Sequence, residues 1–330
     1  DQSDYCKEIN QIKQESNQKE LTPEELHQAR AVLGAVQWRV YQTGPQHAAK
    51  LGYFQSMLTK GDRSMVEGIN TMVREVHAQK ELGLHVYQLC AERDDDLTLV
   101  AWSDAALANR PDLGSTGGYI IGFMHKQFTT GQSRGEVNVM SWGSHRLKRV
   151  CRSSLAAETQ ALAEAEQELM YLRVQWWEML GHKIDLTKAD ETAKNVNAII
   201  MVDAKALYDA AKNCEIQSAG LNLKEKYTAL ELMAIVEHLE RQSTTLRWCN
   251  SDQQLADGLT KSSAQERLKK FLMTGQQWSL MFDESFTSAK KKRKMDARET
   301  EEEFTDVSWV DFLQCQGVSA TIPGACKKPR

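Results

Sequence analysis

The sequence predicts an α/β fold in which a mixed five-stranded sheet is flanked by helices, with a small helical lead-in before it and a disordered tail after it. Two observations support this prediction. From residue 95 onward, the hydrophobic pattern changes from helical spacing to alternation, which is typical of half-buried strands. The patterns then follow the order strand, strand, strand, long helix, strand, helices, strand. Three strands with short links indicate an antiparallel meander, and helices packed on the faces of the sheet complete the fold.

The N-terminal part is expected to be helical after a short disordered end. Residues 1–20 are polar and hold few large apolar side chains. A helix is expected to follow Thr22, because its hydroxyl can cap free N–H groups, a proline suits the first turn, and Glu25 completes a capping box. A second helix is expected at about 62–82, and the two form a lead-in over 21–94.

The region 95–275 is expected to form the sheet and the helices that cover it. The run NAIIMV at 197–202 is continuously apolar after its first residue, as in a strand that is buried on both faces. Gly181 is expected to end the long helix. In chain order, the expected elements are strands at 96–105, 115–124 and 136–145, a helix at 152–180, a strand at 197–202, helices at 204–212 and 221–241, and a strand at 244–249.

The last part of the chain, 276–330, is expected to be a flexible tail. It holds the basic run KKKRK at 290–294, followed by the acidic run ARETEEE. Neighbouring blocks of opposite charge are typical of a disordered linker. The basic cluster has two interpretations, a nuclear-import signal or a patch that binds phosphate. The expected location is intracellular, either cytoplasmic or nuclear.

The composition excludes several classes of protein. The chain of 330 residues has a net charge of −4, so any nucleic-acid site must be local. Its seven cysteines are scattered without zinc spacing. No apolar run approaches about 18 residues, the length that spans a membrane, so no membrane partner is expected. The glycine-rich motifs of nucleotide-binding loops are absent, and no small-molecule cofactor is expected.

Glu158 is the most informative acid, because it lies on the apolar stripe of the expected long helix. It follows Leu155 by three positions and precedes Leu162 by four. A carboxylate that faces a core must be paired or bind a metal, since burying a bare charge is very costly. The alternative is an acid at the exposed start of the helix, partnered by Arg152. From this residue alone, both interpretations stay open.

Three aspartates lie at the ends of expected elements. Asp104 ends the first strand on the same face as Val100 and Trp102. Asp203 directly follows the buried strand, at the carboxyl end where ligands of α/β sheets collect. Asp257 begins a helix after the last strand. Taken singly, Asp203 is better interpreted as a helix N-cap and Asp257 as an ordinary surface acid.

Taken together, the four acids indicate a site for hard divalent cations. Mg²⁺ prefers oxygen ligands and keeps several waters, so carboxylates and a phosphate substrate can complete its shell. Two such ions about 4 Å apart can activate water and stabilise the leaving oxygen in phosphodiester hydrolysis. Spacing alone leaves open whether the four acids meet in space.

Four segments follow one another along the chain: WSDAALANRPDLGSTGGYIIGF at 102–123, MSWGSHRLKRVCRSSLAAETQAL at 140–162, MVDAKALYDA at 201–210 and LRWCNSDQQLADGLTK at 246–261. In content and order they resemble the ribonuclease H region of copia-type (Pseudoviridae-like) retrotransposon Pol polyproteins. Upstream, residues 21–94 are similar to the connection between reverse transcriptase and ribonuclease H in that family. The resemblance thus covers about residues 21–275.

The resemblance implies a ribonuclease H-like fold and an endonuclease that cuts the RNA strand of an RNA/DNA hybrid. The implied cofactor is Mg²⁺, with Mn²⁺ as a substitute ion. Two ions would be held by the four catalytic acids that match the family's motifs, which are Asp104, Glu158, Asp203 and Asp257. A reverse transcriptase domain of the same polyprotein is the implied partner. The alternative is a catalytically silent or host-adopted remnant that binds nucleic acid or protein without cutting.

Further residues near the acids are candidates for contacts with nucleic acid. Ser103, Asn109 and Gln160 are candidates for contacts with 2′-hydroxyls. Basic residues just before the long helix are candidates for phosphate contacts, with a solvated loop as the alternative. These basic residues are Arg146, Lys148, Arg149 and Arg152.

The chain departs from the family pattern at two places. It reads TGPQ at 43–46, where the family usually has Thr-Arg-Pro-Asp, and KYT at 226–228, where many members have Lys-His-Ile. No histidine lies between His238 and Asp257. A histidine-assisted proton transfer or product release therefore stays open, whereas the four acids are unaffected.

Overall fold

The structure, a computed structural model, describes residues 2–13, 20–58, 61–89, 96–131, 133–216 and 225–280. The predicted tail beyond residue 280, with its basic cluster at 290–294, lies outside these residues. Within them, no helix combines the length and the apolar character needed to cross a membrane. The domain boundaries at residues 21, 95 and 276 remain predictions.

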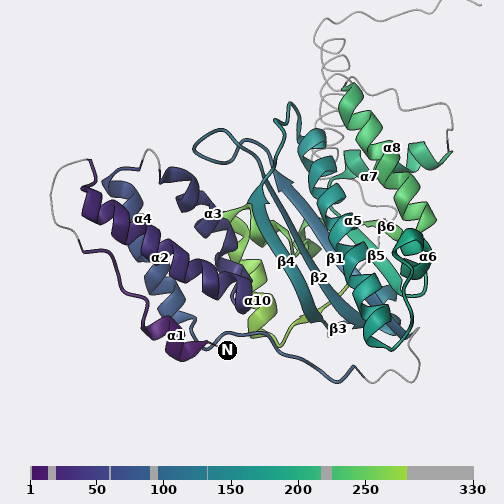
Figure 1. The fold of residues 1–330 in the computed structure, drawn as a ribbon, viewed down its shortest axis with the longest axis horizontal. Coiled ribbons are helices and arrows are strands. Elements are labelled where there is room, and N and C mark those ends of the chain that lie inside the picture. The colour runs from purple at the N-terminus through teal and green to yellow at the C-terminus, as the bar shows by residue number, and fades with distance from the viewer. Residues whose placement is uncertain are drawn as a thin grey trace, which may run out of the picture. The chain divides into compact units, whose positions relative to one another are not determined.

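A mixed sheet of five strands forms the centre of the fold (Figure 1). β1 (Leu97–Ala106) pairs antiparallel with β2 (Thr116–His125), and β2 pairs antiparallel with β4 (Asn138–Arg146). On the other side of β1, β5 (Asn197–Val202) and then β6 (Thr245–Trp248) run parallel to it. The strand order is β4-β2-β1-β5-β6, so the predicted mixed five-stranded sheet is confirmed.

One face of the sheet is covered by the long helix and its neighbours (Figure 1). α5 (Ser154–Met179) packs against β1 and β2, and beside it lie α6 (Ala189–Ala193), α7 (Lys205–Ile216) and α8 (Lys226–Arg241). α5 begins after Ser153, whose hydroxyl accepts a hydrogen bond from the backbone of the first turn. The core between these layers includes Leu99, Ala101, Ile121, Phe123, Leu162 and Leu169.

The lead-in helices and the last helices lie on the side of the opposite face (Figure 1). They are α2 (Pro23–Gln42), α3 (Ala48–Met57), α4 (Arg63–Ala78), α9 (Asp257–Thr260) and α10 (Gln265–Met273). Val100, Trp102 and Ile120 of the sheet share one core with apolar side chains of these helices. Alternate residues of β1 thus belong to two different cores, because successive side chains of a strand point to opposite faces. A short pair of strands, β3 (Gly135–Glu136) and β7 (Gln277–Trp278), joins the end of the described chain to this region.

The start of α2 has the predicted capping box. The hydroxyl of Thr22 accepts a hydrogen bond from the backbone N–H of Glu25 at 3.1 Å, and the Glu25 carboxylate accepts one from the backbone N–H of Thr22 at 2.9 Å. The same carboxylate is fully buried and forms an ion pair with Arg63. The cap therefore also joins α2 to α4.

Residues 2–13 differ from the expectation of a disordered end. They include α1 (Ser3–Lys7), and they bury Cys6, Ile9 and Ile12, the apolar residues at every third position. The backbone of Ile12 exchanges two hydrogen bonds with the side-chain amide of Asn70 in α4, at 2.7 and 3.1 Å. Three regularly spaced apolar side chains, together with these hydrogen bonds, therefore hold a polar segment against the lead-in helices.

Candidate metal centre

Three aspartates from distant parts of the chain meet at one edge of the sheet. Asp104 lies near the carboxyl end of β1, Asp203 directly follows β5, and Asp257 is the first residue of α9. Because β1 and β5 are parallel neighbours, their carboxyl ends lie at the same edge. One carboxylate oxygen from each aspartate lies within 4.8 Å of one from each of the others. Three of the four predicted acids thus come together.

The fourth predicted acid, Glu158, approaches this group from the second turn of α5. Its carboxylate accepts a backbone hydrogen bond from Ala105, the residue after Asp104, and its charge interacts with Asp104 and Asp203. Burial, followed by these two negative neighbours, raises the pKa of Glu158 well above its ordinary value. It lies outside the group within 4.8 Å, and no ion pair with Arg152 forms in the part of the chain that the structure describes.

Asp257 is placed by the close packing of α9 on β2 and β4. The side-chain amide of Asn109 donates to the carbonyl oxygen of Thr260 at 2.9 Å, and the hydroxyl of Ser144 donates to that of Leu259 at 2.6 Å. Gly118, the strand partner of Asp104, leaves the space into which α9 fits. These contacts fix the distance between α9, which carries Asp257, and β1, which carries Asp104.

Gly118→Ala is expected to displace α9 and to weaken metal binding. A methyl group at this position would lie 2.9 Å from both Cβ of Leu259 and Cγ2 of Thr260, closer than such carbon atoms approach. The expected loss in the free energy of unfolding is about 1–3 kcal/mol, as for overpacked cores, measured by urea denaturation. Mn²⁺ titration should show weaker binding as well. Gly34→Ala is the control, since nothing lies within 4 Å of its Cβ position, and an unchanged Gly118→Ala variant would contradict the packing argument.

Hydrogen bonds orient the carboxylates of Asp104 and Asp203. The hydroxyl of Thr260 donates to Asp104, and that of Ser251 donates to Asp203 at 2.9 Å. Asp104 is 1% exposed, and burial raises its pKa to about 7, although the ammonium of Lys261 opposes the shift. Burial also raises the pKa of Asp203. Ionising these two carboxylates therefore costs free energy, and a bound cation would lower that cost.

Two basic residues that the sequence analysis did not single out contact these acids. Lys261 Nζ lies 2.5 Å from Asp257 Oδ1 and 3.3 Å from Asp104 Oδ2. Arg267 Nη1 lies 2.7 Å from Asp257 Oδ2. Burial raises the pKa of Asp257, but the hydrogen bonds and charges of these two cations outweigh it and keep the pKa below its ordinary value. Lys261 follows Asp257 by four positions, a helical spacing that could have indicated the pair.

The arrangement fits a hard divalent cation. Carboxylate oxygens are the ligands that Mg²⁺ and Mn²⁺ prefer, and they converge here from three elements of the fold. The raised pKa values of Asp104 and Glu158 show that neighbouring positive charge would stabilise the ionised acids. Asp257 already has cationic partners, so an ion that binds all three aspartates must share it with Lys261 and Arg267.

Without divalent ions, the protein is expected to lose stability as the pH rises toward neutrality. Asp104 has an ordinary pKa of 3.8 and a pKa of about 7 in the folded chain, so the folded state binds more protons between these values. The free energy of unfolding therefore falls as the pH rises across this range. The stabilising contribution of protonated Asp104 is complete only at the acid end of the range. Relative to Asp104→Asn, which lacks this titration, the loss between pH 5 and 7.5 should be about 2 kcal/mol.

Urea denaturation of both proteins in EDTA over this pH range measures the difference. Mg²⁺ should restore stability to the unaltered chain at pH 7.5. A difference between the two proteins that is independent of pH would contradict the burial of an ionisable Asp104.

The candidates for 2′-hydroxyl contacts mostly have structural partners. Ser103 is 1% exposed, and the amide of Gln160, 8% exposed, accepts from the backbone of Arg149 and donates to Cys151 Sγ. Both residues are thus buried in this structure, and their contact with substrate stays a prediction. Asn109 is exposed, although its side chain also bonds to α9.

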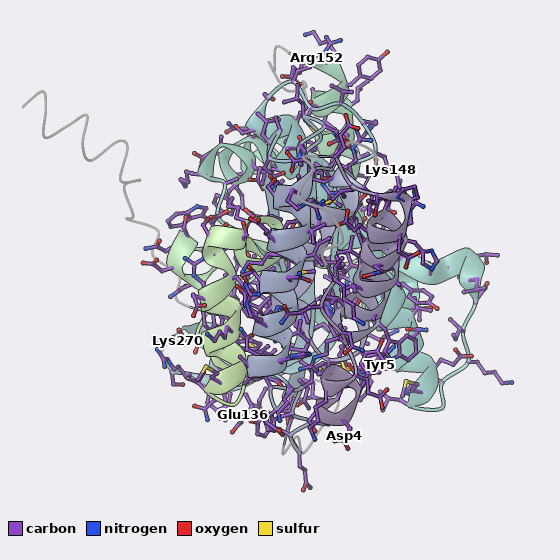
Figure 2. All side chains as sticks on the ribbon, turned by 90° about the vertical axis from the view of Figure 1, so that its left-hand side faces the viewer. Asp4, Tyr5, Glu136, Lys148, Arg152 and Lys270 are labelled. Atoms are coloured by element: carbon purple, nitrogen blue, oxygen red, sulfur yellow. The ribbon has the colours of Figure 1, made fainter. Side chains whose placement is uncertain are left out.

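The candidates for phosphate contacts lie on the surface, and two of them have acidic partners. Arg146 pairs with Asp112 at 3.1 Å, and Arg149 pairs with Glu231 of α8. Lys148 and Arg152 are exposed, and Figure 2 shows both toward the end of the molecule away from Asp4 and Tyr5 of α1. Their contact with phosphate stays a prediction.

Neither a known protein family nor a curated protein sequence matches the chain. Among solved structures, the chain is similar to RNase H1 from the halophilic archaeon Halobacterium salinarum NRC-1, with 12% identity and a TM-score of 0.32 over 52% of this chain and 98% of that one. It is also similar to the foamy viral protease-reverse transcriptase in complex with dsDNA, with 12% identity and a TM-score of 0.30 over 51% and 92% of the two chains.

A third similar structure is the foamy viral protease-reverse transcriptase in complex with RNA/DNA hybrid, with 10% identity and a TM-score of 0.29 over 66% of this chain and 27% of that one. Similarity at this level says nothing about activity. The strand order β4-β2-β1-β5-β6, with β2 antiparallel and β5 parallel to β1 and helices on both faces, is what identifies the fold as ribonuclease H-like.

Proposed function

We propose that the chain is a metal-dependent endonuclease that hydrolyses the RNA strand of an RNA/DNA hybrid, as part of a copia-type retrotransposon polyprotein. The observation that supports this proposal best is the meeting of Asp104, Asp203 and Asp257 within 4.8 Å at the carboxyl ends of two parallel strands. The polyprotein context rests on the resemblance of the four sequence segments, and in that context residues 21–94 connect to a reverse transcriptase domain.

Asp104, Glu158, Asp203 and Asp257 would hold two Mg²⁺ ions, or Mn²⁺ in their place. Ions at such a site supply an activated water and stabilise the departing 3′ oxygen. Thr260 and Ser251 orient two of the carboxylates, and the backbone hydrogen bond from Ala105 favours the ionised form of Glu158. Ligands oriented by such outer hydrogen bonds need little rearrangement when an ion arrives.

The nucleic acid would approach along the exposed basic residues near the start of α5. With a net charge of −4 for the whole chain, this local patch must supply the attraction for phosphates. All four of its basic residues are exposed, and Arg149 and Arg152 line a groove between this loop and the start of α8, together with Tyr227. Binding that depends on a few phosphate contacts should weaken steeply with salt concentration.

Cleavage of a labelled hybrid tests the proposal directly. The purified chain is incubated with Mg²⁺ and an RNA/DNA hybrid labelled on the RNA strand, beside DNA duplex, single-stranded RNA and an EDTA control. We expect internal cuts in the RNA of the hybrid alone, and none in EDTA. Hybrid binding without any cleavage would overturn the enzymatic function and support the silent binding module instead.

A further inference from the structure

Lys261 lies between two of the three clustered aspartates. Its ammonium is 2.5 Å from Asp257 Oδ1 and 3.3 and 3.4 Å from the two carboxylate oxygens of Asp104. The backbone N–H of Lys261 donates to the carbonyl oxygen of Asp257 at 2.9 Å, which closes the single turn of α9. The backbone thus holds Lys261 where its side chain reaches both acids.

Within the described residues, Lys261 and Arg267 are the cations that form ion pairs with members of the aspartate cluster, and they do so differently. Arg267 contacts Asp257 Oδ2 and also lies 3.7 Å from Asp252, so it pairs with only one member of the cluster. Lys261 contacts Asp257 through the other oxygen, Oδ1, and contacts Asp104 at the same time. Only Lys261 therefore bridges two members of the cluster, as a shared metal ion would.

The side chain of Lys261 is able to leave this position. It is 40% exposed, whereas Asp104 is 1% exposed, so the ammonium enters the cluster from the solvent side. Lysine has a flexible four-carbon stem and a compact charge, which can swing away without disturbing the backbone. The carboxylates, in contrast, are held by Thr260, Ser251 and Arg267.

We propose that Lys261 is a built-in counter-ion that bridges Asp104 and Asp257 until a divalent ion takes its place. This inference rests on the proposed metal site. The ammonium contacts carboxylate oxygens that an ion shared by Asp104 and Asp257 would bind, so the two cations compete. Lys261 thereby keeps the acids together in the ion-free chain and weakens ion binding in the absence of substrate. Phosphate oxygens, which commonly complete the Mg²⁺ shell, would then tip the competition toward the ion.

Lys261→Met is expected to bind Mn²⁺ about tenfold more tightly than the unaltered chain, because a partly exposed ion pair that must be broken is worth on the order of one factor of ten in affinity. Calorimetric titration with Mn²⁺ in the absence of nucleic acid measures the difference. Lys261→Gln, which keeps a polar side chain, should show the same direction and guards against a folding defect in the methionine variant. Lys269→Met is the matched control, since Lys269 pairs with Glu266 on the surface of α10, and its affinity should not change.

Thermal unfolding supplies a second measurement. In EDTA, both Lys261 variants should unfold at a lower temperature than the unaltered chain, because the acids lose their bridging cation. Saturating Mg²⁺ should raise their unfolding temperature by more than it raises that of the unaltered chain.

Parallel titration of Asp203→Asn separates the two proposals. If the unaltered chain binds Mn²⁺, Asp203→Asn weakens this binding, and neither Lys261 variant binds more tightly, the counter-ion role is overturned while the proposed function stands. If Asp203→Asn leaves Mn²⁺ binding unchanged, or no protein binds the ion, the metal site itself is wrong and both proposals fall.

Discussion

Asp203→Asn is expected to lower the rate of RNA cleavage on the order of 1000-fold, because the charge stabilisation that metal ions supply is worth several kcal/mol. Asparagine has the shape of aspartate and can still accept the hydrogen bond that Ser251 donates at 2.9 Å, so the local structure should persist. The substitution removes one negatively charged ligand at the edge of the sheet where β1 and β5 end. Single-turnover cleavage of the labelled hybrid in Mg²⁺ measures the loss.

The stability of Asp203→Asn distinguishes a lost ligand from a damaged fold. Burial and the neighbouring Asp257 raise the pKa of Asp203, so a neutral side chain should leave the free energy of unfolding in EDTA unchanged or slightly higher. Asp209→Asn is a matched control, since this acid lies on the exposed side of the adjoining α7 and pairs with Lys205 at 2.9 Å. Full cleavage by Asp203→Asn, or an equal loss in Asp209→Asn, would refute the assigned site.

Arg173→Met is expected to lower the free energy of unfolding by about 3–5 kcal/mol, the usual cost of removing one partner from a buried charged hydrogen-bond network. Arg173 is fully buried in α5, and burial lowers its pKa to about 10, so it stays charged at neutral pH. Its guanidinium donates to the carbonyl oxygens of Val196 and Gln242, each at 2.8 Å, and to the hydroxyl of Thr244 at 2.6 Å.

These hydrogen bonds join α5 to the segments that precede β5 and β6. A methionine fills much of the volume but leaves three buried acceptors without a donor. Urea denaturation measures the change in the free energy of unfolding. The control is Arg241→Met, which removes an exposed partner of Glu237 in α8 and should change this free energy by no more than about 0.5 kcal/mol. A loss that small for Arg173→Met would show that water replaces the guanidinium.

Periodic patterns in the sequence predicted most of the sheet and its order along the chain. The apolar run at 198–202 makes up all of β5 but its first residue, because a strand covered on both faces is apolar at its buried positions. The start of α2 was also predicted correctly, since a capping box involves residues only three positions apart. α3 was not predicted, because within it only Ala48, Leu51 and Gly52 are buried and no clear stripe results.

The four acids were also recognised from sequence, three of them for a local reason. Glu158 stood out because a charged residue on an apolar stripe needs a partner, and Asp203 because it follows a buried strand. Asp257, taken singly, was an ordinary surface acid at the start of a helix, and it gained weight only beside the other three acids and from the resemblance. Its approach to Asp104 depends on the packing of α9 over Gly118, a contact between residues about 140 positions apart along the chain.

The sequence by itself determined the mixed sheet, the flanking helices and the identity of the acids, because these follow from short-range periodicity and from motifs. The tertiary structure decided that three aspartates meet within 4.8 Å and that Lys261 bridges two of them. It also decided that Ser103 and Gln160 are covered and that residues 2–13 pack on the lead-in helices. The physical reason is the same in each case: burial and ion pairing depend on which distant segments occupy the same space, and local spacing carries no information about that.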